Sequence, residues 1–191
     1  MPTRRQFIAL LAAASAYAGG IGIVPAAERR TVNVAGKRAR IIDVHAHCAF
    51  AEVAPLLAGT PLAREIPASQ RLGPERIAAM DARGIDIQAL SVNQYWWYAA
   101  DKALAEKVVL LHDQSLASWC KDHWDRFVSL SSVALQFPDL AATQLERAVH
   151  ELGARGASVG GHVNGEMPTG PKYDVFWAKA QSLDVDRKSV V

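Results

Sequence analysis

Short runs of β-branched and apolar residues alternate along this chain with stretches of helical periodicity, and this alternation restricts the fold more than any other feature. Runs suited to strands occur at 41–47, 85–93, 127–135 and 156–163. Segments with apolar residues at helical spacing follow at 74–83, 101–120, 138–153 and 173–183. Strands that alternate with helices of this length are typical of βαβ units and a parallel sheet. The pattern predicts an α/β fold, either a doubly wound sheet or part of a (β/α)8 barrel.

Glycine and proline mark the borders of these segments. Pro74 stands at a first-turn position and Gly84 at a C-terminal cap, while Gly153 ends another predicted helix. Between residues 49 and 72, prolines and a glycine break any long helix, so we expect a loop with short helical pieces.

The leader differs in composition from the rest of the chain. A polar start with Arg4 and Arg5 precedes an apolar run from Phe7, and small residues lead up to Ala27. We interpret residues 1–27 as a twin-arginine export signal, with an uncleaved membrane anchor and a disordered basic tail as alternatives. Glycines inside the apolar run favour cleavage. We therefore expect a periplasmic or secreted protein that meets the membrane only during export.

Charge and cysteine content argue against two classes of function. The 191 residues include 21 basic and 19 acidic ones, and Arg4 and Arg5 of the leader account for the excess. A neutral mature surface without a basic cluster gives no reason to expect nucleic acid as a partner. Cys48 and Cys120 are too few for a disulfide framework or a thiolate zinc cage, so we expect free thiols.

Two histidines stand one residue apart at the end of the first apolar run, in the stretch IIDVHAHC. Side chains on a strand alternate between faces, so His45 and His47 should share one face, together with Asp43. Parallel α/β folds place their chemistry at the carboxyl ends of strands, and imidazole nitrogens bind Zn²⁺ or Mn²⁺. We expect His45 and His47 to ligate one divalent metal, with hydrogen-bonded core histidines as the alternative. Cys48 is out of phase with the pair.

Other candidate residues fall where further predicted strands end. Trp96 and Trp97 belong to an aromatic run, Tyr95 to Tyr98, that follows the second predicted strand directly; they are predicted substrate contacts at the rim, with packing of a long loop as the alternative. Asn93 ends that strand and is a further predicted contact at the rim. His162 lies at the end of a later strand and is a candidate substrate contact or an exposed loop histidine. The remaining histidines have no partner at ligand spacing and are expected at the surface: His112, His123 and His150.

Several segments together are similar to the amidohydrolase-related family. They are D-x-H-x-H at 43–47, MDARGIDIQALS at 80–91, DRFVSLSSVALQFPDLAATQLERAV at 125–149 and GHVNG at 161–165. The branch that they resemble is that of the aminocarboxymuconate-semialdehyde and γ-resorcylate decarboxylases. The resemblance implies a metal-dependent (β/α)8 barrel in which His45 and His47 supply two ligands. It also implies a further histidine after the fifth strand and an aspartate after the eighth.

The resemblance implies an enzyme with one divalent metal, Zn²⁺ before Mn²⁺, and a small carboxylate as its partner. A non-oxidative decarboxylase of an aromatic or unsaturated acid is the leading hypothesis. A hydrolase of a lactone, ester or amide is the alternative, because both reactions would use His45 and His47 in the same way. A homodimer of the full-length form is also compatible with the resemblance.

The length of the chain bears on this hypothesis. A (β/α)8 barrel needs ~250 residues, whereas residues 41–185, after a charged arm at 28–40, supply about the first four units. Residues 186–191 show neither periodicity nor a cap, and one back-translation of them matches a common sequencing adapter, so we expect a non-native tail. Catalytic residues are expected beyond residue 191, and the alternative to an enzyme is an inactive truncated fragment.

Overall fold

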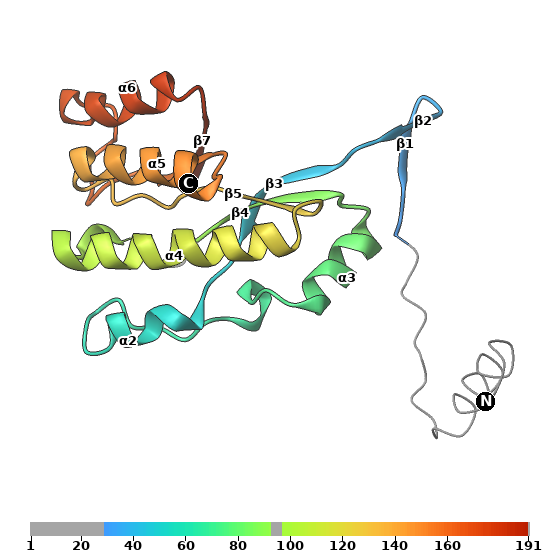
Figure 1. The fold of residues 1–191 in the computed structure, drawn as a ribbon, viewed down its shortest axis with the longest axis horizontal. Helices are drawn as coiled ribbons and strands as arrows, with labels where there is room; N and C mark the ends of the chain where they lie inside the picture. The colour runs from blue at the N-terminus through green and yellow to red at the C-terminus, as the bar shows by residue number, and fades with distance from the viewer. Residues whose placement is uncertain (1–28, 93–96, 191) are drawn as a thin grey trace, which may run out of the picture.

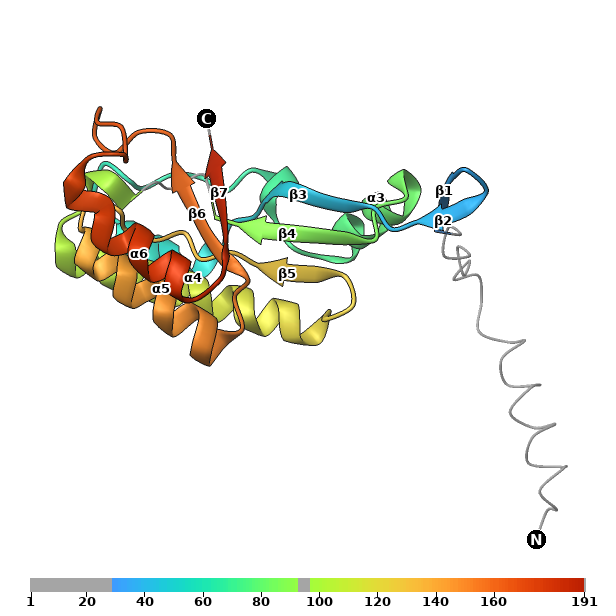
Figure 2. The same cartoon turned by 90° about the horizontal axis from the view of Figure 1, so that it is seen from above.

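The described strands after residue 40 run parallel and follow one another in chain order. The computed structural model describes residues 29–92 and 97–190, with the backbone alone for 186–190. Strands β3 (Ile42–His47), β4 (Ile87–Ser91) and β5 (Phe127–Ser129) form one parallel sheet, and β6 (Gly156–Gly160) pairs in parallel with β7 (Asp186–Val190). A parallel bridge between Ser131 and Ala157 joins the two groups (Figure 2).

A helix follows each of the first four of these strands. They are α3 (Pro74–Arg83), α4 (Lys102–Asp122), α5 (Pro138–Leu152) and α6 (Asp174–Ser182). Shorter helical pieces are α2 (Ala54–Leu57) and the 3₁₀ turns Ala51–Val53, Ala68–Gln70, Trp97–Ala99 and Pro171–Tyr173. The predicted loop with short helical pieces at 49–72 is confirmed.

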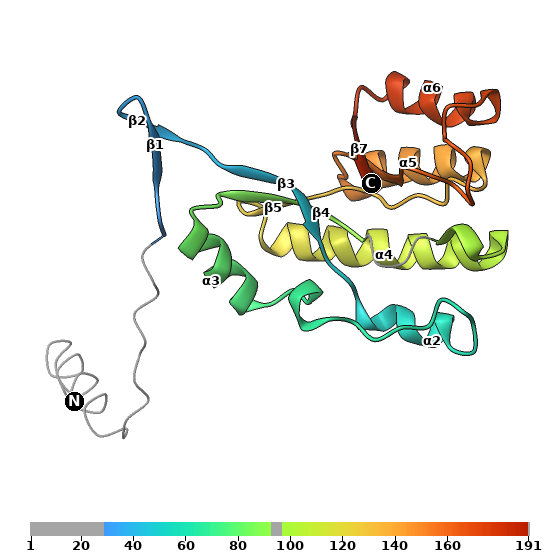
Figure 3. The same cartoon turned by 180° about the vertical axis from the view of Figure 1, so that it is seen from behind.

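The arrangement of these helices separates the two predicted architectures. Helix α5 packs between α4 and α6 on one side of the strands (Figures 1 and 2), and α2 lies along α4 (Figure 3). A doubly wound sheet reverses its strand order at a switch point, whereas the described strands keep chain order throughout. The parallel α/β prediction is confirmed, and the order is the one that a barrel uses.

The helix borders follow the sequence signals. Asp101 caps α4 by accepting a hydrogen bond from the main-chain N–H of Leu104 at 2.8 Å. Gly84 and Gly153 end α3 and α5 in the left-handed conformation, with φ of 73° and 71°. A Cβ on Gly84 would also come within 2.9 Å of the Arg30 carbonyl oxygen, so only glycine fits there without a shift.

Two apolar clusters fill the space between strands and helices. The first joins α2 and α4 to the sheet and includes Leu57, Leu90, Trp97, Val108 and Phe127. The second joins α5 and α6 to β6 and includes Leu145, Val159, Tyr173 and Phe176. Each cluster is built from one face of its helices, as expected of helices that cover a sheet.

His112 differs from its predicted surface position. It is 1% exposed and stacks on Trp97 with ring centroids 4.8 Å apart. Burial lowers the pKa of His112 to about 3, which keeps the ring neutral. The apolar face of α4 includes Ala105, Val108, Val109 and Leu116, and position 112 belongs to that face by helical spacing. His150 is exposed, as predicted, and His123 is half-buried against Trp119.

Two short elements lie outside the predicted pattern. The arm contains an antiparallel hairpin, β1 (Val32–Val34) and β2 (Lys37–Ala39), with Ala35 and Gly36 at positive φ in its turn. The backbone of β7 continues the sheet beside β6, and the non-native origin of residues 186–191 stays a prediction. Across 29–92 and 97–190, none of the helices combines the length and the apolar character that crossing a membrane requires.

Candidate metal site

The two histidines of the D-x-H-x-H motif meet at the carboxyl end of β3. The ring centroids of His45 and His47 lie 4.8 Å apart with an interplanar angle of 83°. His45 is exposed and His47 is half-buried. Nδ1 of His47 lies 3.1 Å from the hydroxyl of Ser91 on β4. In a metal-ligating histidine, a hydrogen bond made by the ring nitrogen that does not bind the metal fixes the orientation and tautomer of the imidazole.

Asp43 does not share the side of the sheet that His47 occupies. The register between β3 and β4 shifts between Asp43 and Ala46, so Asp43 pairs with Gln88 whereas His47 pairs with Ser91. Gln88 and Ser91 are three positions apart on β4 and therefore point to opposite faces. The prediction that Asp43 shares the histidine face is wrong, because strict alternation cannot anticipate a bulge.

The chemistry of the pair would suit part of a metal site. Neutral imidazole nitrogens suit Zn²⁺ and Mn²⁺, so the donor chemistry of His45 and His47 fits a divalent ion. Within the described ranges, no group of three or more His, Cys, Asp or Glu side chains is placed to hold a metal. Cys48 is buried directly after the pair, with Sγ 3.9 Å from the Ser91 carbonyl oxygen. The two histidines are therefore two candidate ligands and not a complete site.

The predicted substrate contacts divide into separate environments. Trp97 is 0% exposed and stacks on His112, so it has no face to offer a substrate ring and we assign it to packing. Asn93 and Trp96 lie outside the described residues. His162 is exposed in the segment after β6, and its role as a substrate contact stays a prediction.

Tyr98 and Asn164 make contacts at this edge that the sequence does not predict. Tyr98 accepts a hydrogen bond on its hydroxyl from the Gly160 N–H at 3.0 Å, and its carbonyl oxygen accepts one from Nδ2 of Asn164 at 2.8 Å. Burial raises the pKa of Tyr98 to about 12. These bonds tie the segment after β4 to the segment after β6. The Asn164-Gly165 pair, typical of a tight turn, was the available signal.

The amino ends of the strands carry a different kind of cluster. Arg126 is 5% exposed and donates to the carbonyl oxygens of Asp86 at 3.0 Å and Ile85 at 3.1 Å. It also forms an ion pair of 2.9 Å with Asp81, which pairs with Arg29 of the arm at 3.0 Å. These charges pair with one another rather than facing an open edge.

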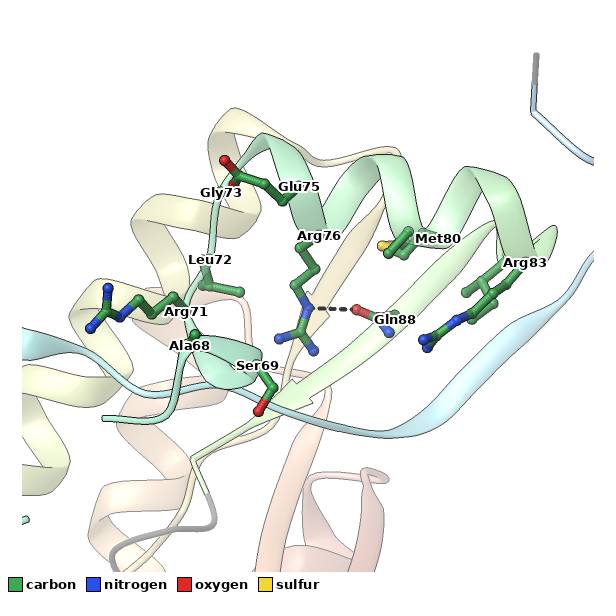
Figure 4. A pocket seen from close by; sticks show the side chains of 12 residues that line it. Ala68, Ser69, Arg71, Leu72, Gly73, Glu75, Arg76, Met80, Arg83 and Gln88 are labelled. Atoms are coloured by element: carbon green, nitrogen blue, oxygen red, sulfur yellow. Dashed lines mark hydrogen bonds between the residues drawn. The ribbon is translucent and has the colours of Figure 1, made fainter. Parts of the chain in front are cut away.

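A cavity of about 580 Å³ lies on the α3 side of β4 (Figure 4). Arg71, Arg76 and Arg83 line it together with Gln88. Arg76 points from α3 toward β4 and donates from Nε to Oε1 of Gln88 at 2.8 Å. Since Gln88 and Ser91 face opposite sides, this cavity lies behind the histidine pair.

Comparison with known proteins agrees with the geometry. The amidohydrolase family model matches residues 42–186. A γ-resorcylate decarboxylase of Rhizobium sp. is 35% identical over 117 residues, which cover 58% of this chain and 36% of the relative. The chain thus spans about a third of the length of the curated relatives that it matches.

Solved structures show the same fold. A 5-carboxyvanillate decarboxylase of Novosphingobium aromaticivorans, complexed with manganese and 4-hydroxy-3-methoxy-5-nitrobenzoic acid, has a TM-score of 0.71 at 22% identity, covering 84% of this chain and 52% of that one. A dihydroxybenzoic acid decarboxylase of Polaromonas sp., with bound manganese and the inhibitor 2-nitroresorcinol, has a TM-score of 0.64 at 27% identity, covering 78% and 48%. The family model covers most of the chain, and the chain belongs to the amidohydrolase family.

Proposed function

We propose that the complete protein is a metal-dependent, non-oxidative decarboxylase of a small aromatic carboxylic acid. The observation that carries the proposal is the convergence of His45 and His47 at the carboxyl end of β3, with the His47 ring held by Ser91. Curated relatives that act as γ-resorcylate decarboxylases support the reaction and the class of substrate.

His45 and His47 would hold one divalent metal. Imidazole ligands suit Zn²⁺, our first choice, and the manganese in the Polaromonas enzyme supports Mn²⁺ as the alternative. When bound, the metal supplies positive charge that orients a carboxylate and stabilises negative charge that develops in the reaction. The exposed ring of His45 gives the site an open side for substrate, while Ser91 keeps the half-buried ring of His47 in one orientation.

The proposal includes a complete (β/α)8 barrel, to which residues 41–185 contribute the first four units. Strands in chain order with helices on one side support it. Ile42 and Val44 of β3 are 52% and 65% exposed, although apolar side chains of a first barrel strand are normally packed. Later strands would cover β3 and supply the remaining metal ligands. A homodimer of this full-length form stays a prediction.

We propose in addition that residues 1–27 direct export through the twin-arginine route. Arg29 and Arg38 of the arm form ion pairs with Asp81 and Asp86 at the amino ends of the strands. The arm is therefore held at the end of the sheet opposite the histidines, which supports the proposal that the leader can be recognised while the domain is folded. Replacing Arg4 and Arg5 with lysine should leave the protein in the cytoplasm, as fractionation and immunoblotting would show.

Product analysis tests the proposed reaction. Protein expressed from its native genomic locus, loaded with Zn²⁺ or Mn²⁺, should release CO₂ from 2,6-dihydroxybenzoate and leave resorcinol. His47→Ala should abolish this release, whereas His150→Ala, an exposed position on α5, should retain it. Cleavage of lactones or esters without any CO₂ release would replace the decarboxylase by a hydrolase.

A further inference from the structure

A network of hydrogen bonds lies behind the histidine pair and has not been assigned a role by the function proposed above. Oδ1 of Asp43 accepts from the main-chain N–H of His45 at 3.0 Å, and Oδ2 accepts from Nε2 of Gln88 at 2.9 Å. Arg76 donates from Nε to Gln88 and from Nη1 to the main-chain oxygen of His47, each at 2.8 Å (Figure 4 shows the first). The Asp43–Gln88–Arg76 network thus links the main chains of both histidines.

The network spans the irregularity in β3. The register shift between Asp43 and Ala46 leaves β3 with one more residue than β4 in this interval. A bulge of this kind interrupts the ladder, so its main-chain groups need other partners. At one end of the interruption the Asp43 carboxylate accepts a hydrogen bond from the His45 N–H, and at the other end the Arg76 guanidinium donates one to the His47 carbonyl oxygen. Among the described residues β4 is the only strand paired with β3, so no strand hydrogen-bonds to the other edge of β3 within the described ranges.

Arginine is well suited to this position. The planar guanidinium donates in two fixed directions at once, whereas the ammonium group of lysine is a compact point charge. Arg83 offers a comparison, because it is exposed on the same helix and lines the same cavity.

We propose that Arg76, acting with Gln88 and Asp43, is a positioning residue that fixes the main chain of His45 and His47 so that both imidazoles converge on one metal ion. The inference rests on the proposed function, since it takes the two histidines to be ligands. In this proposal Asp43 holds the main-chain N–H of His45 and does not ligate the metal. His47 then has two anchors, with Ser91 on its ring and Arg76 on its carbonyl oxygen.

Zn²⁺ titration calorimetry on the full chain tests the positioning role. Arg76→Lys should weaken Zn²⁺ affinity by about 10-fold or more, as the loss of a residue that supports a ligand typically does. Arg83→Lys, the matched control, should leave the affinity unchanged. With Co²⁺ in place of Zn²⁺, the visible spectrum reports ligand geometry, and it should change in Arg76→Lys only. Amide hydrogen exchange at positions 45–48 should accelerate in the same variant.

The outcomes separate this inference from the proposed function. If His47→Ala binds Zn²⁺ as tightly as the unchanged chain, the metal-site proposal fails whatever Arg76 does. If His47→Ala loses binding while folded Arg76→Lys keeps full affinity and an unchanged Co²⁺ spectrum, the positioning role is overturned and the metal site stands. Should Arg76→Lys fail to fold, Gln88→Met removes the shared partner without changing the charge. A folded Gln88→Met variant with unchanged affinity overturns the positioning role equally.

Discussion

The two ends of the sheet use charged and polar side chains in opposite ways. At the amino ends, Asp81 pairs with Arg126 and with Arg29 of the arm, and Arg126 also donates to two main-chain carbonyls. At the carboxyl end of β3, two imidazoles approach each other with one of them exposed. The charges at the amino ends are paired with groups of the same chain, whereas the histidine pair places imidazole nitrogens at an open edge of the sheet.

This difference supports the proposal that one end of the sheet stabilises the fold and the other carries the chemistry. A buried charge with all its partners in place is strongly destabilising when one partner is removed. Two like ligands at an edge add little to folding and suit a metal ion. We therefore expect substitutions at the amino end to change stability without changing metal binding, and substitutions at the histidines to do the reverse.

The largest effect is expected from removing both histidines. The double variant His45→Ala and His47→Ala should lose Zn²⁺ affinity by more than the roughly 100-fold that loss of a supporting residue can cause, because both ligands are gone. Its thermal unfolding should stay close to that of the unchanged chain, since His45 is exposed. Calorimetric titration and circular dichroism measure the two quantities. Retained affinity would place the metal elsewhere.

A smaller effect, on stability alone, is expected at the amino end. Arg126→Ala leaves the Asp81 carboxylate and two main-chain carbonyls without their buried partner and should lower the free energy of unfolding by about 3 kcal/mol. Arg38→Ala is the matched control, because its side chain is 54% exposed and surface ion pairs contribute less than about 1 kcal/mol. Urea unfolding gives both values, and equal losses would contradict the ranking.

The smallest effect is a pH dependence located at the amino end. The main-chain N–H of Ile41, at 2.8 Å, holds the pKa of Asp86 below its ordinary value, and Arg38 and Arg29 add to this against the effect of burial. A carboxyl with a lowered folded pKa stabilises the protein above the unfolded value of about 3.9 and loses that contribution as pH falls through the folded pKa. Asp86→Asn should flatten the acid limb of the stability curve. An unchanged acid limb would show that Asp86 contributes nothing there.

The sequence predicts the order of elements and the histidine pair because both depend on local signals. Pro74, Gly84, Asp101 and Gly153 act within a few residues, and helical or alternating periodicity places the segments between them. Helical spacing puts His112 on the apolar face of α4, but its stacking on Trp97 depends on tertiary packing, which no local signal reports. Trp97 was predicted as a substrate contact with loop packing as the alternative, and His112 was predicted at the surface. The structure buries both side chains.

The bulge in β3 shows a second limit of sequence reasoning. Alternation placed Asp43 with the histidines, and a single extra residue in the strand reverses that conclusion. The partners that stabilise the bulge, Gln88 and Arg76, lie 45 and 29 positions from the β3 residues that they contact. Contacts of that separation are fixed by tertiary packing, so the network could be found only in the structure.

Anomalous X-ray scattering from crystals of the protein expressed from its native locus and loaded with Mn²⁺ or Zn²⁺ tests the central claim most directly. The account predicts one strong anomalous peak within bonding distance of the imidazole nitrogens of both His45 and His47, about 2.0–2.1 Å away for Zn²⁺. It also predicts that Asp43 stays bound to Gln88 and does not join the metal. A peak that involves neither histidine, or one that has Asp43 among its ligands, would contradict the account.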